Sequence, residues 1–135
     1  MTDPHSAGAA GAVRNLLRRE GLALFAAALA LYAQSGAPWM QFLVLFLAPD
    51  LSFVFFAAGS RVGAIAYDAA HSTLGPFALA LASRFAPSVP VLFPLALIWF
   101  AHVGFDRMLG YGLKYATGFS DTHLGFIGRK RRQPA

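Results

Sequence analysis

The sequence contains no cysteine among its 135 residues. Disulfide bonds, thiol nucleophiles and thiolate metal sites are therefore excluded. Charged side chains are also scarce, at 13 % of the chain, where soluble globular proteins have about one quarter. The sequence lacks the phosphate-binding loops GxxxxGK[ST] and GxGxxG, and no serine stands in a Gly-x-Ser-x-Gly context. These absences disfavour nucleotide binding through such loops and acyl transfer through a serine.

Hydrophobic residues, by contrast, make up 57 % of the chain, more than the roughly 45–50 % of soluble proteins. A surface of this composition could not face water on all sides. The net charge is +5, but the basic residues gather near the two chain ends, beside apolar stretches, and form no basic face on a soluble domain. We therefore expect the lipid bilayer to be the partner of this chain, and we expect no nucleic-acid partner.

Four apolar segments approach the length of about 20 residues that a helix needs to cross a bilayer. They are predicted at residues 16–34, 39–59, 62–85 and 91–115. Turn residues separate them, and Pro49 is expected to kink the second segment because it cannot donate a backbone hydrogen bond. The predicted fold class is all-α, a polytopic transmembrane bundle of about four helices. Residues 1–15 are predicted to be a flexible tail, residues 16–115 the transmembrane domain, and residues 116–135 a cytoplasmic segment with a basic end.

The distribution of basic residues predicts the orientation, since lysine and arginine stay on the cytoplasmic side of a membrane. With four crossings, one side carries Arg14, Arg18, Arg19, Arg61, Arg129, Lys130, Arg131 and Arg132. The other side carries only Arg84 near a membrane end. Both termini are therefore predicted to be cytoplasmic. The first segment also resembles a signal peptide, but further hydrophobic segments follow it, which favours an uncleaved helix.

Ionisable residues inside the predicted helices are the strongest functional signal, because each costs at least about 2.5–3.5 kcal/mol at the centre of a membrane helix. Asp50, His71 and His102 are predicted at a similar depth, near the midplane. Asp68 and Asp106 are predicted one helical turn closer to the cytoplasm, each on the helix face of a histidine. The sequence thus indicates two layers of buried polar side chains.

Imidazole and carboxylate groups that converge in a helical bundle are suited to a divalent transition metal such as zinc, iron, manganese or copper. The predicted ligands are Asp50, His71, His102 and Asp106, although Asp106 could instead orient an imidazole. Two alternatives remain open: a proton or ion relay of a transporter or channel subunit, which implies a homo-oligomer, and a structural network or partner-binding protein. The leading hypothesis is a metal-assisted membrane enzyme or a metal-binding membrane protein, so whether the protein is an enzyme is left open.

After the fourth segment the chain becomes polar and rich in glycine, and it is predicted to leave the bilayer. Asp121 and His123 either fold back as a lid over the buried residues or belong to an exposed loop. The candidate catalytic residues are Asp106, Arg107 and His123.

Three motifs carry a family resemblance: LAPDLS at residues 47–52, YDAAH at residues 67–71, and AHVGFDRMLGYGLKYATGFSDTHLG at residues 101–125. On these motifs the chain resembles a bacterial family of short integral membrane proteins that is known only as a domain of unknown function. The resemblance implies a multi-pass protein of the bacterial inner (cytoplasmic) membrane. Asp50, His71, His102, Asp106 and Arg107 fall on the motif positions.

Overall fold

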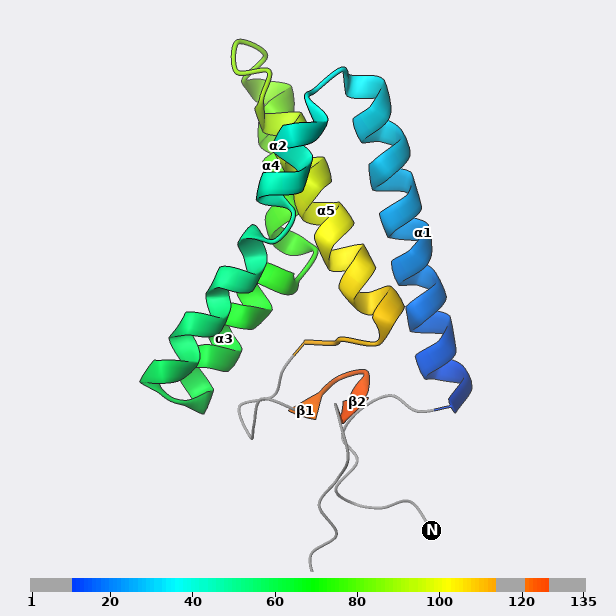
Figure 1. The fold of residues 1–135 in the computed structure, drawn as a ribbon, viewed down its shortest axis with the longest axis vertical. Helices are drawn as coiled ribbons and strands as arrows, with labels where there is room; N and C mark the ends of the chain where they lie inside the picture. Colours follow the sequence, from blue (N-terminus) through cyan, green and yellow to red (C-terminus); the bar gives the residue numbers. More distant parts are fainter. Residues whose placement is uncertain (1–10, 114–120, 127–135) are drawn as a thin grey trace, which may run out of the picture.

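The computed structural model of the chain describes residues 11–113 and 121–126 (Figure 1). The helices are α1 (Gly11–Ser35), α2 (Trp39–Leu45), the 3₁₀ helix η1 (Ala48–Ala58), α3 (Ser60–His71), α4 (Leu74–Phe85) and α5 (Leu92–Leu109). Two short strands, β1 (Asp121–Thr122) and β2 (Gly125–Phe126), pair antiparallel. Apart from this hairpin, the described residues confirm the predicted helical class.

The helices form two legs that diverge from a common upper part (Figure 1). In one leg, α1 packs along α5. In the other leg, η1 and α3 pack against each other as an antiparallel pair, which we call the arm. Helix α4 packs on α5 above the arm. The second and third predicted segments therefore both bend where the arm begins.

The first bend separates α2 from η1 and confirms the kink predicted at Pro49. Pro49 stands in the first turn of η1, where its missing N–H costs no hydrogen bond. Beyond it the chain continues as a 3₁₀ helix of 11 residues, although such runs rarely exceed about four. Gly59 then turns the chain into α3 with φ of 117°, a conformation that favours glycine.

The second bend was not predicted, because residues 62–85 were expected to form one continuous helix. Instead α3 ends at His71, Ser72 is extended, and α4 begins at Leu74. Pro76 explains this break, since its ring would clash with the carbonyl of Ser72 in a continuous helix. A residue of another helix also stabilises the break, because Trp99 Nε1–H on α5 donates a 2.6 Å hydrogen bond to the Ala70 carbonyl.

Helices α1 and α5 approach each other closely at two glycines. A Cβ atom on Gly104 would lie 2.6 Å from the Phe25 backbone nitrogen, and one on Gly21 would lie 2.6 Å from that of Met108. Above this contact, Tyr32 is fully buried and donates a 2.7 Å hydrogen bond to the Pro38 carbonyl. The tightly packed pair α1 and α5 fixes the position of the helix that carries His102 and Asp106.

Two predicted boundaries differ from those of the structure. Helix α1 begins at Gly11, before the predicted start at residue 16. Helix α5 ends at Leu109, before the predicted end at residue 115, because Gly110 adopts the left-handed conformation (φ 93°) that closes a helix. Most of the predicted N-terminal tail and the basic run at residues 129–132 lie outside the described residues.

Much of the described surface is apolar. Two helical segments, Trp39–Ala58 and Leu92–Leu109, are long and apolar enough to cross a membrane. Only 11 % of the first segment is buried inside the molecule, so its hydrophobic side chains face outward. Large exposed side chains such as Leu51, Leu74 and Phe85 extend this apolar surface to η1 and both ends of α4.

Candidate metal site

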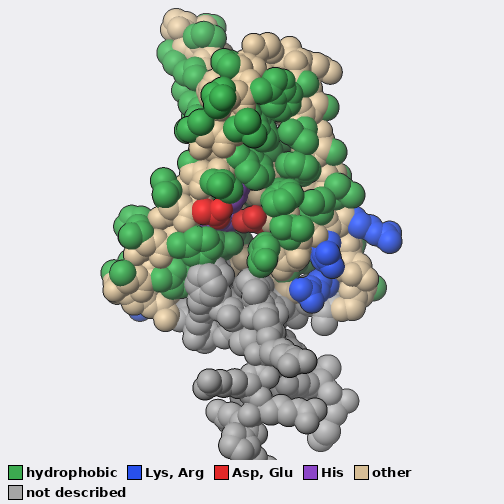
Figure 2. Space-filling view, viewed as in Figure 1, with side chains coloured by type: hydrophobic (Ala, Val, Ile, Leu, Met, Phe, Trp, Pro, Cys, Tyr) green, Lys and Arg blue, Asp and Glu red, His purple; other side chains and the backbone are tan. Residues whose placement is uncertain are grey.

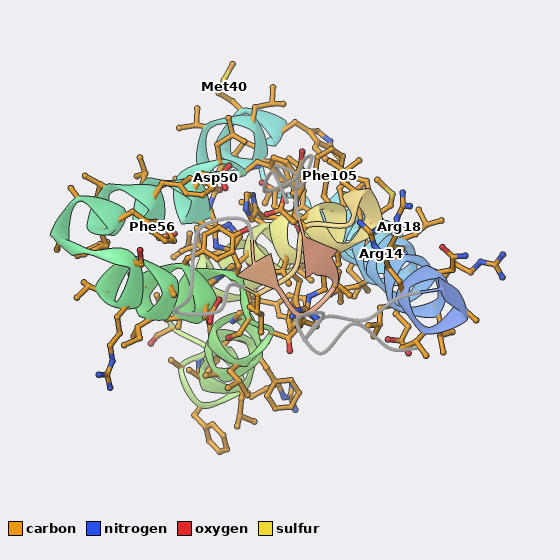
Figure 3. The ribbon with its side chains drawn as sticks, turned by 90° about the horizontal axis from the view of Figure 1, so that it is seen from below. Arg14, Arg18, Met40, Asp50, Phe56 and Phe105 are labelled. Carbon is orange, nitrogen blue, oxygen red and sulfur yellow. The ribbon has the colours of Figure 1, made fainter. Side chains whose placement is uncertain are left out.

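Two breaks and one continuous helix place the four predicted ligands. Asp50 lies in the first turn of η1, and His71 is the last residue of α3. His102 and Asp106 lie one turn apart on α5. Figure 2 shows acidic and histidine side chains together near the middle of the helical part, framed by hydrophobic ones. In Figure 3, Asp50 lies at the inner end of the arm, with Phe56 farther out.

The four side chains converge on one point, with one ligand atom from each lying within 4.8 Å of all the others. The two histidine Nε2 atoms are 3.0 Å apart. Asp50 Oδ1 lies 3.2 Å from His71 Nε2 and 3.3 Å from His102 Nε2. Asp106 Oδ2 lies 3.4 Å from His71 Nε2 and 3.3 Å from His102 Nε2. Both Nε2 atoms therefore face both carboxylates.

The Nδ1 atom of His71 fixes the orientation of the imidazole ring. Nδ1–H donates a 2.9 Å hydrogen bond to the Tyr67 carbonyl, one turn earlier on α3. The Tyr67 ring also stacks on the imidazole, with the ring centres 3.8 Å apart and an angle of 10° between the planes. A neutral His71 held in this way presents the lone pair of Nε2 to the cluster, as in histidine ligands of metals.

His102 is more enclosed, with 1 % of the residue exposed. Its Nδ1 is buried, on the side of the ring that faces away from the cluster, and the main chain of Phe46 lies near the imidazole. The Phe46 ring contacts the imidazole edge-on, with the ring centres 5.4 Å apart. His102 is thus fixed by packing, and its Nε2 is the atom that meets the other three side chains.

The carboxylates differ in exposure, since 37 % of the Asp50 side chain is accessible and only 16 % of that of Asp106. Two carboxylates so close together repel each other when both are ionised. Protonated imidazoles or a divalent cation would balance the charge. The more exposed Asp50 marks the side from which an ion or ligand can reach the cluster.

The structure changes the predicted layering. Asp106 belongs to the same cluster as the two histidines and not to a separate lower layer. Asp68 lies outside the group of four, as do Arg107 and His123. Arg107 follows Asp106 on α5 and interacts electrostatically with Glu20 on α1. The catalytic role of Asp106, Arg107 and His123 stays a prediction.

His123 holds the hairpin against the end of α5. Its Nδ1 accepts a 2.8 Å hydrogen bond from the Leu113 backbone N–H, and its own N–H donates to the Leu113 carbonyl. Burial and the nearby charge of Arg107 lower the pKa of His123. The side chain of Asp121, predicted to act with His123, is outside the described part of the structure.

Sequence reasoning missed two supporting contacts. One is made by Tyr67, whose carbonyl and ring orient His71. Trp99 was not singled out, although a tryptophan within an apolar helix needs an acceptor for its N–H. The position of Trp99, one helical turn before His102, was the signal in the sequence that could have indicated this contact.

A family profile described as "Domain of unknown function (DUF4260)" matches residues 14–127, which is most of the chain. The chain belongs to the DUF4260 family. No curated protein and no solved structure matches it. The match confirms the predicted membership in a family of unknown function, while the bacterial origin stays a prediction. All four residues of the cluster lie within the part of the chain that defines the DUF4260 domain.

Proposed function

We propose that this DUF4260 protein is an integral membrane metalloprotein in which Asp50, His71, His102 and Asp106 bind one divalent transition-metal ion. The spacing of the ligand atoms carries the proposal. A tetrahedral ion with bonds of about 2.0–2.1 Å holds neighbouring ligand atoms about 3.3–3.4 Å apart. The five separations given above, from 3.0 to 3.4 Å, lie close to that value.

The chemistry of the donors favours a first-row transition metal. Imidazole nitrogen suits zinc, iron and copper, and carboxylate oxygen also suits manganese. A divalent ion would neutralise the two carboxylates and remove their repulsion. The Tyr67 carbonyl already fixes His71 in the tautomer that a metal requires. The protein would thus supply a nearly preformed site.

The membrane setting is supported by the exposed apolar side chains and by the two helix breaks. Irregular backbone at membrane depth is tolerated only where it is covered by protein or lines a cavity, and it often forms a binding site. Asp50 and His71 stand at these breaks. We place the protein in the bacterial cytoplasmic membrane with both termini in the cytoplasm, since Arg14, Arg18 and Arg61 lie near the lower ends of α1 and the arm.

Access to the ion would come past Asp50, the more exposed ligand. Asp106, Arg107 and His123 remain the candidate catalytic residues of such a centre. The charge of Arg107 acts on His123, so these two side chains lie toward the same end of α5.

Metal analysis of the purified protein tests the proposal. The protein is prepared without a polyhistidine tag, reconstituted with zinc, iron or manganese, and analysed by mass spectrometry. We expect about one ion per chain, and binding at least about tenfold weaker in Asp106→Asn and His102→Gln. Asp68→Asn is the matched control, because it neutralises a carboxylate on α3 outside the cluster, and it should keep the ion.

A folded wild-type protein that takes up less than about one-tenth of an ion per chain with every metal would contradict the proposal. The relay alternative would then gain support from the 3.0 Å contact between the two imidazoles, if proteoliposomes containing a pH dye showed proton flux that Asp106→Asn abolished.

A further inference from the structure

A second feature lies at the helix breaks, beside residues that adjoin the ligands in the sequence. It is an apolar cavity of about 290 Å³ that opens to the surface. Its walls include Leu45, Ala48, Pro49, Ala70, Leu79 and Trp99. This volume is at the lower end of the range for small-molecule pockets, which is about 300–1,000 Å³. The bends in both segments create this space.

The walls of the cavity offer almost nothing to a polar ligand. The indole N–H of Trp99 is occupied by its hydrogen bond to the Ala70 carbonyl. The other residues that line the cavity contribute aliphatic side chains and a proline ring. A buried water needs about two to four polar partners, so water would be held poorly here. Within a bilayer, hydrocarbon is the favourable occupant.

The cavity and the cluster share parts of the same backbone. Pro49 immediately precedes Asp50, and Ala70 immediately precedes His71. On α5, Ile98 lines the cavity one turn before His102. A hydrocarbon chain in the cavity would therefore contact residues that adjoin Asp50 and His71 along the backbone.

We infer that the cavity holds the hydrocarbon chain of a membrane amphiphile whose polar head reaches the metal site. This inference rests on the proposed function and names the substrate class of that site: a lipid or lipid-like molecule that enters from the bilayer. The apolar cavity binds the chain, and the accessible Asp50 leaves room for the head beside the ion.

Photolabelling tests the cavity. Palmitic acid with a diazirine in mid-chain is added to the protein in lipid nanodiscs, and the labelled residues are mapped by mass spectrometry. We expect labelling of the cavity walls that excess unlabelled palmitic acid suppresses. Leu79→Trp should weaken this labelling at least about tenfold by filling the cavity, since each excluded methylene lowers affinity several-fold. Leu81→Trp, on the exposed surface of α4, is the matched control and should label like wild type.

Cobalt substitution tests the link to the metal. Palmitic acid should change the visible spectrum of the Co²⁺-loaded protein at concentrations at which acetic acid does not. Leu79→Trp should lose this change, and Leu81→Trp should keep it.

The possible outcomes distinguish a failure of the amphiphile inference from a failure of the metal proposal. Labelling that excess palmitic acid does not suppress, in a protein that holds its full complement of metal, would overturn this inference and leave the metal site standing. An equal spectral change with acetic acid would also overturn it, because the chain would then contribute nothing. Suppressible labelling in a protein that takes up no metal would overturn the metal proposal, and with it the assignment of the amphiphile as a substrate.

Discussion

The two ring nitrogens of His71 have different neighbours, and this difference organises the site. Nδ1–H bonds to a carbonyl of the same helix, one turn back, at the point where that helix ends. Nε2 points away from the helix to Asp50, Asp106 and His102. The end of α3 therefore does more than change the direction of the chain, because it leaves an imidazole anchored on one side and free to bind on the other.

His123 provides a test of how the hairpin is held. Because its native pKa is lowered, the neutral form is favoured in the folded protein, and Nδ1 must be unprotonated to accept from Leu113 N–H. The unfolded state binds the proton more readily, so the stabilisation by His123 is present above pH 6.5 and is lost as the pH falls through the lowered pKa. We expect the protection of the Leu113 amide, measured by hydrogen exchange and corrected for intrinsic rates, to fall several-fold between pH 7 and pH 5.

His123→Asn is the control, since an amide oxygen can accept from Leu113 N–H but does not titrate in this range. Its protection is expected to be lower than that of wild type at pH 7 and to vary little with pH. The same fall in both proteins would show that another group causes the pH dependence.

At the scale of the elements, the sequence predicted four apolar segments and four of the five connections between the described helices. Pro49 indicated the first bend directly. The break before Pro76 was not predictable from the local sequence, because a proline can also produce only a mild kink. The full break is stabilised by Trp99 of a distant helix, which donates a hydrogen bond to the Ala70 carbonyl. The four ligands were predictable because ionisable side chains are conspicuous in apolar segments. Their arrangement as one cluster depends on both bends, which bring the ends of η1 and α3 against α5.

The contact between α1 and α5 gives a prediction at this scale. In Gly104→Ala the new Cβ would lie 2.6 Å from the Phe25 nitrogen and 2.8 Å from the Gly21 carbonyl oxygen, both backbone atoms of α1. The helices must separate, at a cost of about 1–3 kcal/mol that outweighs the gain of about 1 kcal/mol in helix propensity. We expect a lower Tm in detergent. We also expect weaker metal binding, because His102 lies two residues away on α5.

Ala26→Leu serves as the control, since Ala26 lies on the exposed side of α1 and can accept a larger apolar side chain. Its Tm and metal content should match those of wild type. If Gly104→Ala behaved in the same way, the two helices would not be in backbone contact in the membrane.

At the scale of the whole molecule, the helices form two separate legs (Figure 1). The paired helices α1 and α5 form one leg, and the arm diverges from it (Figure 1). The two legs meet at the cluster, to which the arm contributes Asp50 and His71. Large apolar side chains are exposed on both legs. Two apolar helices agree with the membrane setting that the composition predicted. The divergence of the legs was not predicted, because it depends on contacts between segments far apart in the chain.

The orientation in the membrane is the last prediction, and the absence of cysteine makes it straightforward to test. Ser60 is the first residue of α3, and Ser88 lies in the connection between α4 and α5; both are exposed, at opposite ends of the helices. Arg61 adjoins Ser60, and basic residues are retained on the cytoplasmic side, so Ser60 should face the cytoplasm and Ser88 the opposite side. In intact bacterial cells, a membrane-impermeant maleimide should label Ser88→Cys but not Ser60→Cys, and permeabilisation should allow labelling of both. The cysteine-free wild type gives the background. The reverse pattern would invert the orientation, whereas labelling of both variants in intact cells would show that the connections do not lie on opposite sides of a membrane.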